Sequence, residues 1–155
     1  MNDAVLSAVT TLQVTRVFAA SRERVFRAWT EPRALKKWFR VAEGYTTPIA
    51  EVDLRVGGGY RLGMQPPGSD TPLIVRGVYC EIRPPERLVF TWGWEGSPEA
   101  VPETLVTVEF FERADQTEVV LTHERLADAA ARDQHASGWE GCLDGLAQAI
   151  AREEV

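Results

Sequence analysis

The chain has few of the residues that mark several common classes of protein. It has only two cysteines, Cys80 and Cys142, which are too few for a disulfide framework. Each lies in an apolar stretch, so we expect two buried, reduced thiols. Lys36 and Lys37 are the only lysines, and the arginines are scattered. With a net charge of -6, the chain lacks the clustered basic surface that nucleic acid binding requires.

Long apolar runs are also missing. No stretch approaches the roughly 18 apolar residues of a membrane-spanning helix, and the first ten residues carry no basic segment of a secretion signal. We therefore expect a cytoplasmic protein with no membrane association. Its 155 residues, 45% of them apolar, suit one domain over 1–155 with a core at 12–151.

Motifs for common chemistries are absent as well. There is no G-x-S-x-G nucleophile motif, and "GGGYRLG" has Leu62 where a nucleotide-binding loop needs its last glycine. His123 and His135 are the only histidines, and neither has a cysteine or carboxylate at a metal-ligand spacing. We expect no metal, no cofactor and no recognisable catalytic set.

The order of expected elements defines the fold class. Residues 12–19 read as a strand, and Ser21 and Thr30 as caps of two short helices, the second with Pro32 in its first turn. About six strands follow between 45 and 124, separated by proline and glycine turns, and a long helix starts near Ala127. The class is therefore α+β, with a curved antiparallel sheet that the last helix covers.

The final two strands form an expected hairpin. If Asp115 and Gln116 are its loop, Phe110 pairs with Leu121 and a mostly apolar stripe of each strand lies on one face. The same alternation turns His123 inward.

The last helix contains three glycines, Gly138, Gly141 and Gly145, although each costs about 1 kcal/mol relative to alanine in a helix. They fall within about 60° of one another and border the apolar face that carries His135, Trp139 and Cys142. Such a stripe either lets the helix approach the strands closely or leaves space for a cavity, and both can hold at different ends.

An aromatic stripe is expected on one strand, where Phe90, Trp92 and Trp94 alternate with smaller residues. If these rings point toward the core, they line a cavity. If they point to solvent, they form an apolar surface for a partner or a homodimer. We favour the inward orientation for Trp92.

The order of several motifs resembles a known family. The runs "SRERVFRAWTEPRALKKWF", "DLRVGGGYRL", "GVYCEIRPPERLVFTWGWE", "TLVTVEFFERADQTEVVLTHERL" and "RDQHASGWEGCLDGLAQAI" resemble homologues of the activator of the 90-kDa heat-shock protein ATPase, in the START-like, polyketide-cyclase-like (SRPBCC) superfamily. The resemblance covers about 14–150. It implies a helix-grip fold, also described as TATA-box-binding-protein-like, with a hydrophobic cavity between the sheet and the last helix.

Three functions are consistent with this resemblance. The first is binding of a small hydrophobic or aromatic ligand in the cavity. The second is a cyclase- or hydrolase-like enzyme that uses His123, His135 or Tyr60 there, and the third is a co-chaperone that stimulates a heat-shock chaperone ATPase. A homodimer is compatible with all three. The expected lining residues are Tyr60, Met64, Trp92, Phe110, His123, His135, Trp139 and Cys142.

Overall fold

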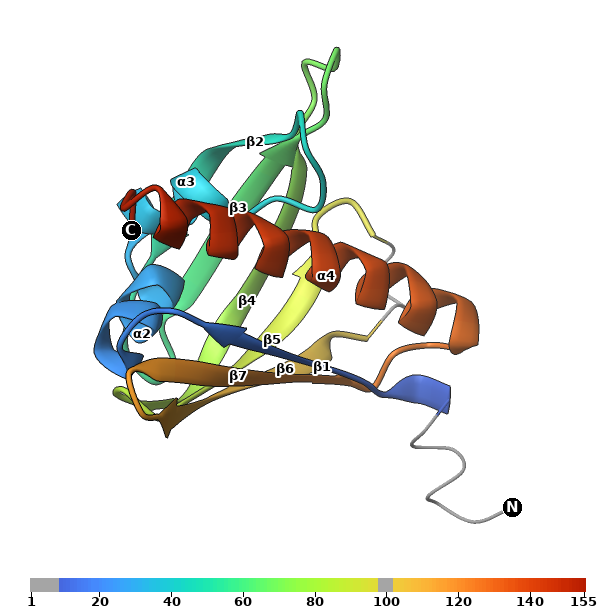
Figure 1. The fold of residues 1–155 in the computed structure, drawn as a ribbon. Helices are drawn as coiled ribbons and strands as arrows, with labels where there is room; N and C mark the ends of the chain where they lie inside the picture. Colours follow the sequence, from blue (N-terminus) through green and yellow to red (C-terminus); the bar gives the residue numbers. More distant parts are fainter. Residues whose placement is uncertain (1–8, 98–101) are drawn as a thin grey trace.

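The computed structural model describes residues 9–97 and 102–155, so the first eight residues of the expected domain lie outside it. From Leu12 onward, the described part of the chain runs through a strand, two short helices, six more strands and a long C-terminal helix (Figure 1). The elements are β1 (Leu12–Phe18), α2 (Arg22–Thr30), α3 (Pro32–Trp38), β2 (Thr46–Val52), β3 (Gly59–Gln65), β4 (Leu73–Arg83), β5 (Arg87–Trp94), β6 (Thr104–Arg113), β7 (Gln116–Glu124) and α4 (Ala129–Ala151).

The strands form a seven-stranded sheet in the order β1-β7-β6-β5-β4-β3-β2, and every neighbouring pair is antiparallel. Figure 1 shows α4 lying along the inner side of the curled sheet, with α2 and α3 near its C-terminal end. The α+β class and the helix-grip arrangement, including two short helices after the first strand, are thus confirmed.

The short helices begin and end largely where their local sequence predicts. Ser21 caps α2, since its hydroxyl accepts a hydrogen bond from the Arg24 amide at 3.3 Å. The expected cap at Thr30 is wrong. Thr30 is the last residue of α2 and its hydroxyl donates to the Phe26 carbonyl at 3.2 Å, so α3 starts after Glu31 without a side-chain cap. Pro32 occupies the first turn of α3, where its missing N–H costs nothing.

The β6–β7 hairpin differs from the expected register by two residues. Its loop is Ala114 and Asp115, so Gln116 pairs with Arg113 and Phe110 pairs with Val119 instead of Leu121. Ala114 adopts a φ of 57°. Alanine seldom takes a positive φ, so the sequence does not predict a turn at this position. Since a shift of two residues preserves the side-chain alternation, the inward face is the expected one.

The concave face of the sheet and the inner face of α4 enclose the core. Fully buried strand residues include Val75, Leu88, Val106, Val108, Val119 and Leu121. The expectation for the two cysteines holds only for Cys142, because Cys80 alternates to the outer face of β4 and is exposed. Side chains alternate between the two faces of β4, so the preceding residue, Tyr79, points to the inner face and is buried.

Candidate ligand pocket

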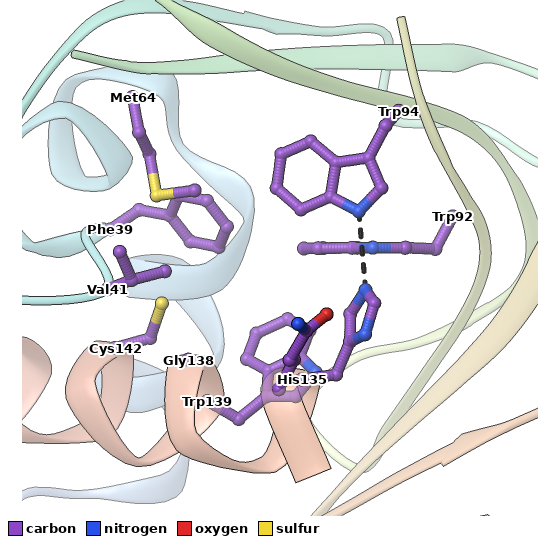
Figure 2. Close-up of a pocket in the computed structure, with 10 residues that line it drawn as sticks. Phe39, Val41, Met64, Trp92, Trp94, His135, Gly138, Trp139 and Cys142 are labelled. Carbon is purple, nitrogen blue, oxygen red and sulfur yellow. Dashed lines mark hydrogen bonds between the residues drawn. The ribbon is translucent and has the colours of Figure 1, made fainter. Parts of the chain in front are cut away.

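A pocket of about 230 Å³ lies between α4, the segment that follows α3, and strands β3 and β5. Figure 2 shows its side chains converging from these elements on a common space. They are Phe39, Val41, Met64, Trp92, Trp94, Gln134, His135, Gly138, Trp139 and Cys142. Among these described residues there is no lysine, arginine, aspartate or glutamate, so the lining is aromatic and apolar with a few neutral polar groups.

The glycines of α4 explain how the helix sits beside this pocket. A β-carbon on Gly141 would lie only 1.7 Å from the Val41 carbonyl oxygen, and one on Gly145 would lie 2.5 Å from that of Trp38. These two glycines let α4 contact the backbone after α3. A β-carbon on Gly138 would meet only a methyl group of Val41, at 3.4 Å, and Gly138 itself lines the pocket. The same row of glycines therefore makes close backbone contacts at Gly141 and Gly145 and borders the open pocket at Gly138.

The close approach is made to the segment after α3 rather than to a strand. Of the two alternatives left open for the glycine stripe, the cavity beside Gly138 is present, whereas the close approach at Gly141 and Gly145 is not to the strands. The backbone of Trp38 and Val41 lies against α4 at these two glycines, and this path of the chain cannot be predicted from the spacing of residues in the sequence.

Tryptophan rings form one wall of the pocket. The Trp92 and Trp139 ring centroids are 4.9 Å apart, and Phe39 lies 6.3 Å from Trp92 and 6.1 Å from Trp139. The inward orientation favoured for Trp92 is confirmed, because the residue is buried. Interlocking aromatic contacts of this kind hold the rings in place and leave flat apolar surfaces toward the cavity.

His123 holds this wall from behind. The Trp139 indole N–H donates to His123 Nδ1 at 3.1 Å, so the imidazole proton resides on Nε2 and is donated to the Thr104 hydroxyl at 2.7 Å. Thr104 in turn donates to the Trp92 carbonyl at 3.1 Å. His123 therefore connects Trp139 of α4 to the strand that carries Trp92.

Both nitrogens of His123 are engaged in its neutral form. Burial, with a smaller contribution from His135, lowers the pKa of His123 to about 3. Protonation would place a second N–H against the Trp139 donor. His123 thus stays uncharged at neutral pH and acts as a structural hydrogen-bonding residue.

His135 lies at the edge of the pocket next to Trp94. Its Nδ1 is 2.8 Å from the Ala131 carbonyl and donates to it, so its Nε2 accepts the Trp94 indole N–H at 3.3 Å (Figure 2). This hydrogen bond joins α4 to the end of β5 and holds two lining side chains in fixed positions.

A second, narrow pocket of about 20 Å³ adjoins the first and shares Phe39, Trp92 and Trp139 with it. Tyr60 lines this narrow space and donates its hydroxyl proton to the Thr91 carbonyl at 2.5 Å. Burial raises the pKa of Tyr60 well above its ordinary value, so the group stays protonated.

Five of the eight expected lining residues surround the main pocket: Met64, Trp92, His135, Trp139 and Cys142. Tyr60 lies at the narrow one. Phe110 lines neither pocket, because its ring packs in the core against Phe26 at 5.3 Å and Trp29 at 6.4 Å. His123 lies behind the wall. The participation of these residues in ligand binding stays a prediction.

Three further lining residues, Phe39, Val41 and Gln134, were not anticipated from the sequence. Phe39 resembled an ordinary core residue of a short helix, and nothing in its spacing places it near α4. The glycine stripe was the available signal, since a bare helix face implies that another segment comes close.

Cys142 and the metal-ligand types complete the description of the site. Burial raises the pKa of the Cys142 thiol to about 12, so it is not a thiolate nucleophile at neutral pH. Among the described residues, no three histidine, cysteine, aspartate or glutamate side chains gather closely enough to hold a metal ion.

These features define a helix-grip protein with an aromatic pocket between its sheet and its last helix. The sequence model of the family described as "Activator of Hsp90 ATPase homolog 1-like protein" matches residues 19–151, and the chain belongs to this family. The resemblance noted in the sequence is thereby confirmed. No curated protein matches the chain.

Solved structures give the same fold. A protein from Chromobacterium violaceum is 29% identical with a TM-score of 0.80, covering 90% of this chain and 95% of that one. A protein from Silicibacter pomeroyi named AHSA1 is 27% identical with a TM-score of 0.80, covering 92% and 99%. An HSP90 activator from Plasmodium falciparum is 26% identical with a TM-score of 0.65, covering 84% and 87%.

Proposed function

We propose that the protein binds a small apolar or aromatic molecule in the pocket between α4 and the sheet. The observation that carries this proposal is a cavity of about 230 Å³ walled by Phe39, Trp92 and Trp139, with no charged side chain in its described lining. An apolar cavity of roughly 150 Å³ is enough to bind benzene. The pocket therefore suits a ligand of one or two rings, smaller than a typical drug.

The construction of α4 supports the proposal. Gly141 and Gly145 are required by close backbone contacts, but a β-carbon on Gly138 would find ordinary contact distance. An alanine there would strengthen the helix by roughly 0.5–1 kcal/mol, so Gly138 gives up stability at the one glycine position that borders the pocket. We take this as a sign that the space is used.

Binding is better supported than catalysis in the same cavity. The cyclase- or hydrolase-like alternative needs a proton donor or acceptor, yet both nitrogens of His123 and His135 are engaged and Tyr60 is bonded to a carbonyl. A general base needs a pKa near the working pH, and that of His123 is about 3. We therefore propose a receptor or carrier role.

A thermal-shift experiment tests the proposal with a set of one- and two-ring aromatic compounds. A ligand at a hundred times its Kd stabilises the native state by about 2.7 kcal/mol, which corresponds to a rise in Tm of roughly 5–10 °C for a domain of this size. We expect at least one compound to produce a saturable rise.

The matched control is Gly138→Leu, which places a side chain in the cavity while leaving the close contacts of Gly141 and Gly145 intact. Its fold is checked by circular dichroism. The rise in Tm should be lost in this variant, and a rise that survives there would place the ligand elsewhere. No saturable shift with any compound would overturn the proposed function.

A co-chaperone role is a second candidate, favoured by the similarity to the Plasmodium protein named an HSP90 activator. The measurement is the ATPase rate of a purified Hsp90-type chaperone with and without this protein. Stimulation that persists in Gly138→Leu would indicate that the outer surface is responsible. An unchanged rate would remove this candidate.

Location and assembly are proposals of the same kind. None of the helices in the described part of the chain combines the length and apolar character needed to cross a bilayer. We propose a cytoplasmic protein, which cell fractionation tests, and a homodimer, which sedimentation velocity at several protein concentrations tests. A single species with the mass of one chain, 17.3 kDa, would contradict the dimer.

A further inference from the structure

We infer that the pocket binds an amphipathic ring compound in one orientation. Its apolar part lies at the Cys142 end of the pocket, and an uncharged hydrogen-bonding substituent lies at the Gln134 end, where the amide of Gln134 binds it. The inference rests on the proposed function of the pocket and goes further, because it assigns the orientation of the ligand, the chemistry of its polar end and the residue that selects it.

The pocket extends along α4, because its lining includes a row of residues on one side of that helix. The row is Gln134, His135, Gly138, Trp139 and Cys142. Its ends are eight residues apart, which corresponds to about 12 Å along the helix axis. The pocket is therefore long enough for an aromatic ring with a substituent at either end.

The lining becomes more buried from the Gln134 end to the Cys142 end. Gln134 is exposed, and His135 and Gly138 are half-buried. Trp139 and Cys142 are each 2% exposed. The pocket therefore meets solvent at its Gln134 end, where a substituent can keep part of its hydration.

The side chains across the space from α4 differ in the same direction. In Figure 2, Met64 and Phe39 lie on the Cys142 side, and Trp94 lies on the His135 side. Met64 and Phe39 are buried and offer thioether and phenyl surface, whereas Trp94 is half-buried. A polar group at the Cys142 end would lose its hydration without a strong hydrogen-bonding partner in the described lining, so the apolar part of the ligand lies there.

Gln134 carries the available polar side chain at the open end. The Trp94 indole donates to His135 Nε2, and His135 Nδ1 donates to the Ala131 carbonyl, so these groups are already paired. The Gln134 amide forms no hydrogen bond with the described part of the chain. A ligand can therefore bind this amide without breaking a bond within the protein.

The chemistry of an amide favours an uncharged partner. The Gln134 side chain has one carbonyl acceptor and two N–H donors and carries no charge. A carboxylate only accepts hydrogen bonds and an ammonium group only donates them, so each engages half of the amide. A carboxamide or a similar group offers a donor and an acceptor together and engages both halves.

Two isomers test the orientation. In 4-ethylbenzamide the ethyl and carboxamide groups lie at opposite ends of the ring, whereas in 2-ethylbenzamide they are neighbours. Dissociation constants are measured by NMR titration of the ¹⁵N-labelled protein. We expect 4-ethylbenzamide to bind about tenfold more tightly, because only this isomer can bury its ethyl group while its carboxamide stays at the open end.

Gln134→Ala tests which residue binds the polar end. A hydrogen bond between neutral, partly exposed groups is worth about a twofold to fivefold change in affinity. The variant should weaken 4-ethylbenzamide by that factor and leave 4-ethyltoluene, which has a methyl group in place of the carboxamide, unchanged. Because Gln134 is exposed, the substitution should not disturb the fold. An equal change for both compounds would contradict the role of Gln134.

Gln134→Lys tests the same position with a charge. A lysine beside the polar end attracts a carboxylate, so the affinity of 4-ethylbenzoate relative to 4-ethylbenzamide should rise about twofold to fivefold. Gln116→Lys is the matched control, because it makes the same change of charge at an exposed glutamine of β7 that does not line the pocket. This ratio should keep its wild-type value in Gln116→Lys. The same rise in both variants would reflect net charge alone and would overturn the placement of the polar end at Gln134.

The wild-type titrations complete the test. The side-chain amide resonances of Gln134 should shift with 4-ethylbenzamide and not with 4-ethyltoluene. Tighter binding of 4-ethylbenzoate or of 4-ethylbenzylammonium than of 4-ethylbenzamide would show that the substituent is charged and overturn the inference. Binding of 4-ethyltoluene with no preference between the two isomers would also overturn it and leave the proposed function standing, whereas failure of every probe to bind would overturn both.

Discussion

His123 shows how a single buried side chain supports the pocket wall without touching the pocket. It is fully buried, accepts a hydrogen bond from the Trp139 indole N–H and donates one to the Thr104 hydroxyl. Both bonds need the neutral imidazole with its proton on Nε2. Trp139 and the Trp92 backbone are thereby held in one arrangement, and the pocket depends on their spacing.

The stability of the protein should decrease as the pH falls because of His123. Its pKa is about 3 in the folded state, below the ordinary 6.5, so its stabilising effect is complete above pH 6.5 and is lost as the pH falls toward 3. Between pH 7 and pH 5 this loss amounts to about 2 kcal/mol. Urea unfolding at both pH values should show a larger decrease for the wild type than for His123→Gln.

The comparison isolates His123 because other titrating groups are common to both proteins. His135→Gln keeps His123 and its hydrogen bonds, so it should retain this part of the pH dependence. Equal decreases in the wild type and in His123→Gln would contradict the assignment of a buried neutral histidine.

Residue identity alone gave part of this picture. Alternation along the hairpin predicted that His123 points inward, and it does. Which atoms it would meet depends on how α4 packs, because its partner Trp139 lies on that helix, 16 residues further along the chain. For that reason the sequence placed His123 in the lining rather than behind it.

Among the elements, α4 combines close packing with an opening. Gly141 and Gly145 contact the backbone after α3, and Gly138 borders the pocket. The same helix is joined to β1 by Arg16, which binds Glu140 at 3.0 Å and Asp144 at 2.9 Å. These contacts fix the distance between α4 and the sheet.

Alanine substitutions at the glycines should have opposite effects. Gly141→Ala would place a β-carbon 1.7 Å from the Val41 carbonyl oxygen, so α4 must move away from the segment after α3. We expect a loss of about 3 kcal/mol, or a decrease in Tm of roughly 6–12 °C. Gly138→Ala should raise Tm by roughly 1–4 °C through helix propensity.

Both values are obtained by thermal denaturation followed by circular dichroism. The two variants add the same methyl group to the same helix, so each serves as the control for the other. Similar changes in both variants would show that helix propensity, and not the contact with Val41, governs this stripe.

Element boundaries were predictable where the signal is local. Ser21 and Pro32 act at the helix starts they mark, because a cap needs only the next three residues. Thr30 and the hairpin loop were mispredicted because their outcome depends on packing beyond the local turn. The β6–β7 register differs from the expected one by two residues, and such a shift leaves the same side chains on the inner face of the sheet.

In the whole molecule, the pocket joins elements that are distant in the sequence. Its lining comes from the segment after α3, from β3, from β5 and from residues 134–142 of α4. A ligand in this space should therefore slow amide hydrogen exchange in 39–41, 92–94 and 134–142 together, with little change in the edge strand β1.

Hydrogen exchange measured by mass spectrometry, with and without an aromatic compound that raises Tm in the thermal-shift experiment, checks this pattern. Gly138→Leu is again the control, since a filled pocket should show no ligand-dependent change. Protection limited to one surface segment would indicate binding outside the pocket.

The sequence by itself determined the α+β class, the order of strands and helices, and the inward face of the hairpin strand that carries His123, because these follow from periodicity and local capping. Family resemblance added the helix-grip arrangement. Only the tertiary structure decided which side chains surround the pocket, since Phe39 and Val41 meet Trp92 and Gly138 through the path of the chain. It also decided that His123 hydrogen-bonds Trp139 and Thr104 behind the pocket wall, because hydrogen-bond partners are set by distances between elements and not by spacing along the chain.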